Sequence, residues 1–139
     1  MKKVLLMLVL VVACTVLNAQ GIVGKWVTID DETGKEKSHV EIYKKGDTFY
    51  GKIVHIVNPQ KRSGKCRKCE GFNKNKPILG MQIINGLKRD GDVYEDGTIL
   101  DPNKGKEYDC ALWLDEHGDL QVRGYVAFFY RTQTWKKLK

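Results

Sequence analysis

The chain has 139 residues, of which 42% are apolar and 29% are charged, and this balance indicates one globular domain with a single core. Its formal net charge of +7 allows attraction to anionic lipid or polysaccharide. The sequence has no module that combines aromatic and basic side chains for nucleic acid, so DNA and RNA are excluded as expected partners.

Residues 1–19 have the organisation of a secretory signal peptide. Lys2 and Lys3 precede an apolar run over 4–12, and Ala19 provides a small residue at the expected cleavage point. The run is too short for a comfortable membrane span, so we expect no transmembrane span in the mature form. A retained signal anchor is the alternative.

A second form of processing is also compatible with the leader. The segment 11–14 resembles a bacterial lipobox, in which Cys14 would become the lipidated N-terminus, although no polar linker follows it. We prefer soluble export to the periplasm or the medium, followed by one domain over 20–139. Loss of the two leader lysines leaves 22 basic residues from 24, against 17 acidic residues, a net charge of +5.

Short alternating segments follow, separated by turns every 8–12 residues, and this pattern is typical of an all-β fold. The predicted strands, in chain order, are 25–29, 38–43, 48–57, 79–83, 97–100, 107–114, 120–126 and 130–135. Apolar residues on both faces of 48–57 predict a central strand or a bulge. Because strands joined in sequence need closure to hide their edges, we predict an antiparallel β-barrel of about eight strands with little helix.

One long irregular segment, 58–77, interrupts the strands. Its basic residues are Lys61, Arg62, Lys65, Arg67, Lys68, Lys74 and Lys76. A loop of this length inside a compact domain is usually functional or poorly ordered. Its charge predicts contact with anionic envelope lipid or polysaccharide, and a solvated loop with no partner is the alternative.

The same loop carries Cys66 and Cys69, for which three interpretations remain open. A disulfide, either local or with Cys110, suits an exported protein. Nearby cations would lower the thiol pKa values of a redox pair, but no thioredoxin-like βαβ pattern is present. A zinc site would need four ligands, and only this pair has metal-like spacing. Cys110 shares a strand face with apolar residues, so we expect it to be buried and inert.

A catalytic constellation cannot be assembled from the remaining residues. His39 and His55 lie in predicted strands and His117 lies in a turn, and the acidic residues are mostly in turns. No nucleophile elbow, zinc-protease motif or phosphate loop is present. We therefore expect a protein that is not an enzyme and has no cofactor.

The sequence resembles the bacterial secreted family called domain of unknown function 2147. The matching segments are 24–26 (Gly-Lys-Trp), 50–54, 66–69 (Cys-Arg-Lys-Cys), 76–80, 97–102, 122–125 (Val-Arg-Gly-Tyr) and 131–135 (Arg-Thr-Gln-Thr-Trp). The resemblance implies a lipocalin-like, calycin-type barrel. It implies no established activity.

In lipocalins, the Gly-x-Trp strand is joined to the end of the barrel by an arginine that packs over the tryptophan. The resemblance therefore implies that Gly24, Trp26 and Arg131 close the barrel, with Arg123 as the second choice for the arginine. A guanidinium over an indole ring contributes roughly 0.5–2 kcal/mol, which makes this role physically reasonable.

The barrel interior is the remaining candidate site. Its expected lining includes Tyr108, Leu112, Leu114, Val122, Met81 and Ile83. The mouths of barrels are favoured places for apolar ligands. The first functional hypothesis is an exported, non-catalytic barrel that binds a small apolar molecule in the cell envelope. The alternative is a structural or interaction module that uses the basic Cys-x-x-Cys loop.

Overall fold

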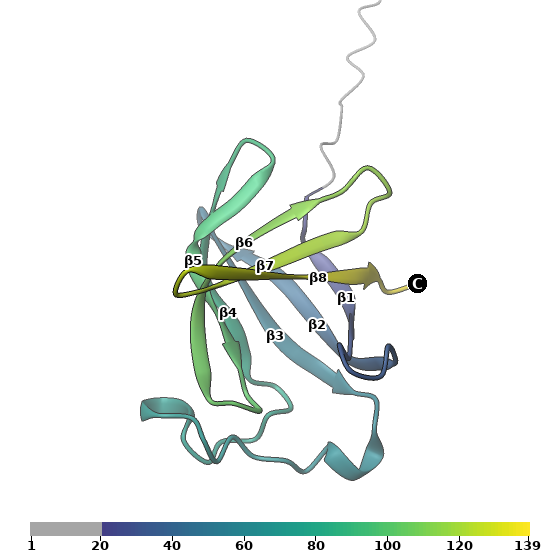
Figure 1. Ribbon diagram of the computed structural model, residues 1–139, viewed down its shortest axis with the longest axis vertical. Coiled ribbons are helices and arrows are strands. Elements are labelled where there is room, and N and C mark those ends of the chain that lie inside the picture. The colour runs from purple at the N-terminus through teal and green to yellow at the C-terminus, as the bar shows by residue number, and fades with distance from the viewer. Residues whose placement is uncertain (1–20) are drawn as a thin grey trace, which may run out of the picture.

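Eight antiparallel strands form a closed barrel in which each strand pairs with its neighbours in sequence (Figure 1). The structure is a computed structural model that describes residues 21–139, so the predicted signal peptide and Cys14 lie outside the described residues. The strands are β1 (Gly24–Ile29), β2 (Glu36–Lys45), β3 (Thr48–Ile56), β4 (Gln82–Asp90), β5 (Val93–Asp101), β6 (Lys106–Leu114), β7 (Leu120–Val126) and β8 (Phe129–Lys137). This arrangement confirms the predicted all-β barrel.

Alternating side chains explain why these segments form strands with one face in the core. In β2, Ser38, Val40 and Ile42 are buried, while the residues between them are partly accessible. β1 and β8 close the barrel through only two paired positions, Trp26 with Lys137 and Val27 with Lys136. Closure pairs these two strands, so that neither is left as a free edge.

Several strands are longer than the sequence predicted, among them β2, β4, β5 and β8. β4 begins at Gln82, not at residue 79, and β5 begins at Val93, not at residue 97. The alternation of β5 is interrupted because its pairing with β6 shifts between Tyr94 and Gly97. Between them, Asp96 has a φ of +65°, so the two halves of β5 are out of phase.

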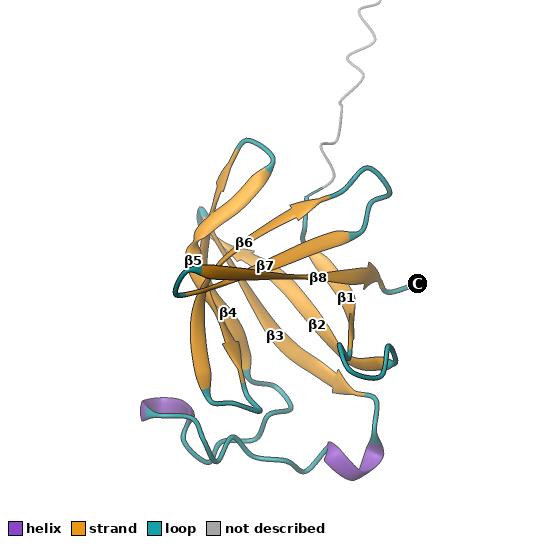
Figure 2. Ribbon diagram, viewed as in Figure 1, coloured by secondary structure: helices purple, strands orange, loops and turns teal. Residues whose placement is uncertain are grey.

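A similar phase change explains the apolar residues on both faces of β3. Its pairing with β4 shifts between Phe49 and Gly51, and its pairing with β2 shifts next to His39. The ribbon remains one continuous strand in Figure 2. The bulge alternative for the segment 48–57 is therefore the correct one.

The order of the strands gives the barrel two distinct ends. The β1–β2, β3–β4, β5–β6 and β7–β8 connections lie at one end, which we name the loop end. The β2–β3, β4–β5 and β6–β7 turns lie at the other, together with the start of β1, and we name it the N-terminal end. Figure 1 shows the long β3–β4 connection below the strands at the loop end.

This β3–β4 connection, residues 57–81, is named the basic loop. It contains two short 3₁₀ turns, η1 (Pro59–Lys61) and η2 (Gly71–Asn73), which Figure 2 shows in purple. Cys66 and Cys69 are almost fully buried in the same core cluster as the barrel residues. The basic loop is thus packed onto the barrel through its cysteines.

Candidate functional site

The residues predicted to line a ligand cavity lie mostly in the packed core. Leu112, Val122, Met81 and Ile83 are buried in one continuous cluster. Leu114 packs against this cluster, and Tyr108 is half-buried. The cluster also contains two tryptophans, Trp26 and Trp135. The residues expected to line a ligand site thus belong to one buried hydrophobic cluster.

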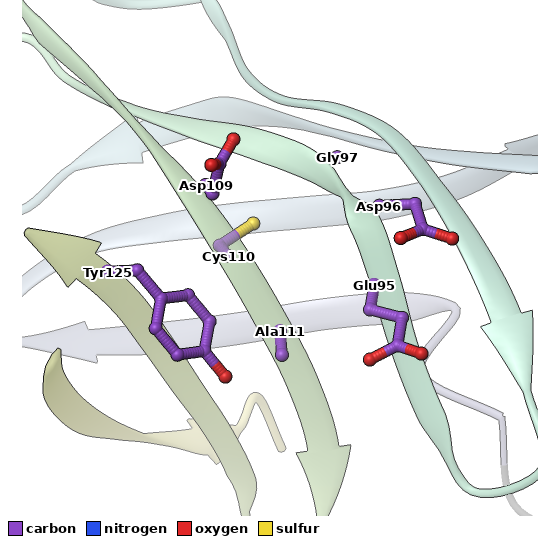
Figure 3. Close-up of a pocket in the computed structure, with 7 residues that line it drawn as sticks. All are labelled: Glu95, Asp96, Gly97, Asp109, Cys110, Ala111 and Tyr125. Atoms are coloured by element: carbon purple, nitrogen blue, oxygen red, sulfur yellow. The ribbon is translucent and has the colours of Figure 1, made fainter.

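An open groove lies where β5, β6 and β7 run side by side (Figure 3). It has a volume of about 420 Å³ and includes the bulge of β5. Its lining residues are Glu95, Asp96, Gly97, Asp109, Cys110, Ala111 and Tyr125. Three of them are carboxylates, which makes this groove unsuitable for an apolar ligand.

These carboxylates do not form a metal site. Within residues 21–139, no group of three or more His, Cys, Asp or Glu side chains is arranged to hold a metal ion. Asp109 and Glu107 instead act on Cys110: burial first, and then these two negative charges, raise the pKa of its thiol to about 12. The Cys110 thiol is therefore protonated at neutral pH.

A second open pocket, of about 360 Å³, lies at the N-terminal end beside the β4–β5 and β6–β7 turns. Arg89 and Tyr94 line it, and the Arg89 guanidinium carbon is 5.4 Å from the centre of the Tyr94 ring. Tyr94 in turn meets Phe49 edge to face, with ring centres 4.9 Å apart. The aromatic side chains therefore plug this end of the barrel beneath the pocket.

The Gly-x-Trp segment closes the barrel, but with a different cation from the one expected. The indole nitrogen of Trp26 donates a hydrogen bond to the carbonyl of Ile22 at 2.8 Å. The ammonium nitrogen of Lys137 lies 4.8 Å from the centre of the Trp26 ring. Gly24 has a φ of +138°, and a Cβ there would lie 2.5 Å from the same nitrogen.

Arg131 was expected over Trp26, and the structure corrects this assignment. Arg131 pairs with Asp31 in the β1–β2 turn, at 2.9 Å, and its side chain is 63% exposed. The physical reason is register: in the β1–β8 ladder, Trp26 is paired with Lys137, six residues beyond Arg131. Arg123, the second choice, stacks between Trp113 and Tyr130, at 4.8 and 4.1 Å from their ring centres.

Cys66 and Cys69 form a disulfide, with Cα atoms 5.3 Å apart. The Cys66 sulfur lies 3.2 Å from the carbonyl oxygen of Pro102 in the β5–β6 turn. Backbone hydrogen bonds from Cys66 to Lys76 and from Asn75 to Cys66, both 2.8 Å, join the two sides of the basic loop. Because the disulfide is buried, thiol exchange would require the basic loop to leave the barrel.

The basic loop presents its charges to solvent. All seven Lys and Arg residues in 57–81 are exposed, and Glu70 is the one acidic residue of this segment. Within residues 21–139, none of the seven has a carboxylate within 4.0 Å. The loop end therefore carries a concentrated and uncompensated positive charge.

The three histidines lie in two separate places in the barrel. His39 and His55 face each other across β2 and β3, with ring centres 4.7 Å apart. Partial burial and the neighbouring His55 hold the pKa of His39 below its ordinary value. His117 lies in the exposed β6–β7 turn, 3.4 Å from Glu116.

One prominent surface feature is absent from the sequence-based predictions. The β7–β8 hairpin exposes large apolar side chains at residues 125–130, which we name the aromatic hairpin. Phe128 is 98% exposed and Phe129 is 75% exposed. The signal in the sequence is the unbroken run Tyr-Val-Ala-Phe-Phe-Tyr, because a hairpin tip normally carries polar turn residues.

Comparisons with known proteins agree with the fold. A solved structure, protein HP1028 from the human pathogen Helicobacter pylori, is described as a member of the lipocalin family. It superposes with a TM-score of 0.75 and 21% sequence identity, covering 86% of this chain and 84% of that one. This similarity shows a lipocalin-like fold.

A comparison with curated proteins finds no match. None of the helices in residues 21–139 is long and apolar enough to cross a membrane. Residues 24–137 match a family of uncharacterized proteins conserved in bacteria, DUF2147, and the chain belongs to this family.

Proposed function

We propose that this protein is an exported, non-catalytic interaction module that binds an anionic component of the bacterial envelope through its basic loop. The observation that carries the proposal is the set of seven exposed cations in 57–81, with a single acidic residue among them. The shared chemistry of the expected partners is a dense array of phosphate or carboxylate groups. Such arrays attract exposed Lys and Arg residues over roughly a Debye length.

The way in which the basic loop is held supports this role. The Cys66–Cys69 disulfide joins the tip of the loop, and Gly105 lies directly against Lys68. These contacts fix the loop on the barrel and reduce the conformational freedom that its backbone would lose on binding. The cations are thus presented on an ordered surface.

The first hypothesis from the sequence, a small apolar ligand inside the barrel, has less support. The interior side chains belong to the core cluster, and the two pockets described above are open and lined in part by carboxylates. Native mass spectrometry of protein from its own host tests it directly. A small molecule that co-purifies reproducibly would favour the carrier function over the one proposed here.

Binding to anionic vesicles and to a soluble anionic polysaccharide tests the interaction module. We expect simultaneous substitution of Lys65, Arg67 and Lys68 by Gln to weaken binding by about tenfold or more at low salt. The matched control replaces Lys25, Lys45 and Lys88 by Gln, which removes the same charge from exposed positions outside the basic loop. Equal losses in both triple variants would reject the basic loop as the binding surface.

A further inference from the structure

The aromatic hairpin is the most apolar exposed segment of the described chain. Tyr125, Val126 and Tyr130 are 43%, 45% and 62% exposed, in addition to the two phenylalanines. Contiguous exposed apolar surface of this kind usually marks a protein or membrane interaction site. Nothing within residues 21–139 covers it.

The hairpin holds these side chains in an ordered array. Pairing continues to the tip, with Tyr125 opposite Tyr130 and Val126 opposite Phe129. The tip is a two-residue turn in which Ala127 has a φ of +52°, an uncommon value for a residue with a side chain. Arg123 stacks on Tyr130 and donates a hydrogen bond to Thr132 at 3.1 Å, which fixes the base of the hairpin.

The aromatic hairpin and the basic loop lie at the same end of the barrel. Tyr125 is opposite Asp109 in β6, so the tip runs beside the start of that strand. The turn that precedes β6 contains Gly105, which lies against Lys68 of the basic loop. Seven of the eight large hydrophobic side chains that are exposed in residues 21–139 come from these two segments.

The basic loop combines apolar and basic side chains in the same way. Phe72, in η2, is 86% exposed, and the Lys76 ammonium nitrogen lies 5.4 Å from the centre of its ring. The N-terminal end is mixed in charge: its turns at 90–92 and 115–119 carry five carboxylates, and its exposed basic residues include Lys25, Lys44, Lys45, Lys88, Arg89 and Lys137. The loop end is therefore distinguished by exposed aromatic rings together with the unpaired cations of the basic loop.

We infer that the aromatic hairpin inserts into the interfacial layer of a lipid bilayer that contains anionic headgroups. The phenylalanines enter the acyl boundary, and Tyr125 and Tyr130 lie at headgroup depth, where tyrosine is favoured. The basic loop contacts the headgroups, and the N-terminal end of the barrel faces away from the membrane. This inference rests on the proposed function and specifies lipid as its partner.

A lipid surface fits these features better than a second copy of the chain. The apolar side chains project from a narrow hairpin tip, and a second copy meeting it tip to tip would not neutralise the unpaired cations of the basic loop. A bilayer offers both an apolar layer for the tip and negative charge for the loop. Self-association remains a distinct outcome of the experiment.

Insertion is tested with full-length protein, and all variants share residues 1–20, so that any contribution of the leader is common to them. The hairpin variant Phe128→Ser/Phe129→Ser is compared with the wild type for sedimentation with vesicles containing phosphatidylglycerol. We expect the partition coefficient to fall by about tenfold or more, and to remain low at high salt. Val23→Ser, at the N-terminal end, is the control and is expected to bind as the wild type does.

The depth of the hairpin tip in the bilayer is measured by fluorescence. Phe128→Trp places an indole at the tip, and lipids brominated near the headgroup should quench its emission, whereas Val23→Trp should be unaffected. Unchanged vesicle binding of Phe128→Ser/Phe129→Ser, or an unquenched Phe128→Trp, would overturn insertion. Each of these substitutions alters only exposed side chains. The circular dichroism spectrum of each variant should therefore match that of the wild type.

The outcomes separate this inference from the proposed function. If the basic-loop triple variant loses binding and the hairpin variant does not, the proposed function stands and insertion is wrong. If the hairpin variant alone loses binding, insertion stands and the electrostatic function is wrong. If the wild type is a dimer that the hairpin variant converts to a monomer, and no quenching occurs, the hairpin is a self-association surface and insertion is again wrong.

Discussion

The ammonium nitrogen of Lys137 lies 4.8 Å from the centre of the Trp26 ring, across the β1–β8 seam that closes the barrel. Trp26 is 1% exposed, and its indole N–H is satisfied by the carbonyl of Ile22. The Trp26 ring therefore stabilises the seam in three ways. It buries apolar surface, it donates a hydrogen bond, and one of its faces packs against Lys137 of β8. Most of this stabilisation comes from burial of the apolar ring, because Lys137 itself is exposed to solvent.

Substitution of Trp26 by Ala should lower the free energy of unfolding by about 3–5 kcal/mol, as expected for a large core aromatic. Lys137→Met keeps the aliphatic stem and removes the charge, so its loss should be limited to about 0.5–1 kcal/mol. Urea denaturation followed by circular dichroism measures both. Equal stability of Trp26→Ala and the wild type would contradict the role of Trp26 in closure.

Arg131 should contribute much less than Trp26 does. Its ion pair with Asp31 is largely exposed, and exposed pairs are usually worth about 0.2–1 kcal/mol. Gln133 also donates to the same Asp31 oxygen, at 2.7 Å, and would retain part of the contact. We expect Arg131→Ala to unfold within about 1 kcal/mol of the wild type in the same urea assay. A loss of unfolding free energy comparable to that of Trp26→Ala would show that Arg131 does take part in closing the barrel.

Period and turn spacing were sufficient to predict the strands because burial alternates cleanly in segments such as β2. They failed at β5, where Asp96 and the register shift beside Gly97 break the period. They failed also for the cation over Trp26, because its identity depends on the stagger between the first and last strands. Local sequence carries no information about that stagger.

Only part of the candidate site could be predicted from the sequence, because the rest depends on contacts between distant segments. The charge of the basic loop is visible in composition, whereas its attachment to the β5–β6 turn is a tertiary contact. The sequence predicts the aromatic hairpin only as the end of the strand 120–126 and the start of the strand 130–135. Phe128 lies in the turn itself, where alternation gives no direction for the side chain.

Gly105→Ala should detach the basic loop from the barrel. Gly105 has a φ of +65°, and a Cβ there would overlap the Lys68 carbonyl group of the basic loop. Gly34→Ala is a matched control, since Gly34 has a φ of +69° but no atom within 4 Å of the added Cβ. The clash should destabilise Gly105→Ala by about 1–3 kcal/mol more than the control.

The detachment itself is measured by trypsin cleavage after the lysines and arginines of the basic loop. Faster cleavage in Gly105→Ala than in Gly34→Ala is expected, because an unpacked loop enters the protease more readily. Identical cleavage rates and stabilities in the two variants would show that Gly105 does not hold the loop.

The Cys110 thiol should be inert in the folded protein. It is 3% exposed and lies between Gly97 and Gly124 of the neighbouring strands, and its pKa is raised to about 12. At pH 8 the thiolate is therefore about one part in ten thousand of the population. Iodoacetamide should label the Cys110 peptide only after denaturation, with Cys110→Ala as the control for peptide assignment. Rapid labelling of the native protein would contradict the burial of this thiol.

His39 should make stability depend on pH. Its pKa is lowered in the folded state, first by partial burial and then by His55, with Lys25 adding to the effect and Glu36 opposing it. Below about pH 6.5, the unfolded chain therefore binds a proton at this residue more readily than the folded chain does. The free energy of unfolding should fall as the pH decreases through this window, and this contribution should be constant at higher pH.

The measurement is urea denaturation between pH 7.5 and 5. Because other groups also titrate, the informative quantity is the difference between the wild type and His39→Gln, which should lose less stability on acidification. His117→Gln removes a histidine from the exposed β6–β7 turn, away from the His39–His55 pair, and should follow the wild type. Parallel stability curves for His39→Gln and the wild type would show that protonation of His39 is not coupled to folding.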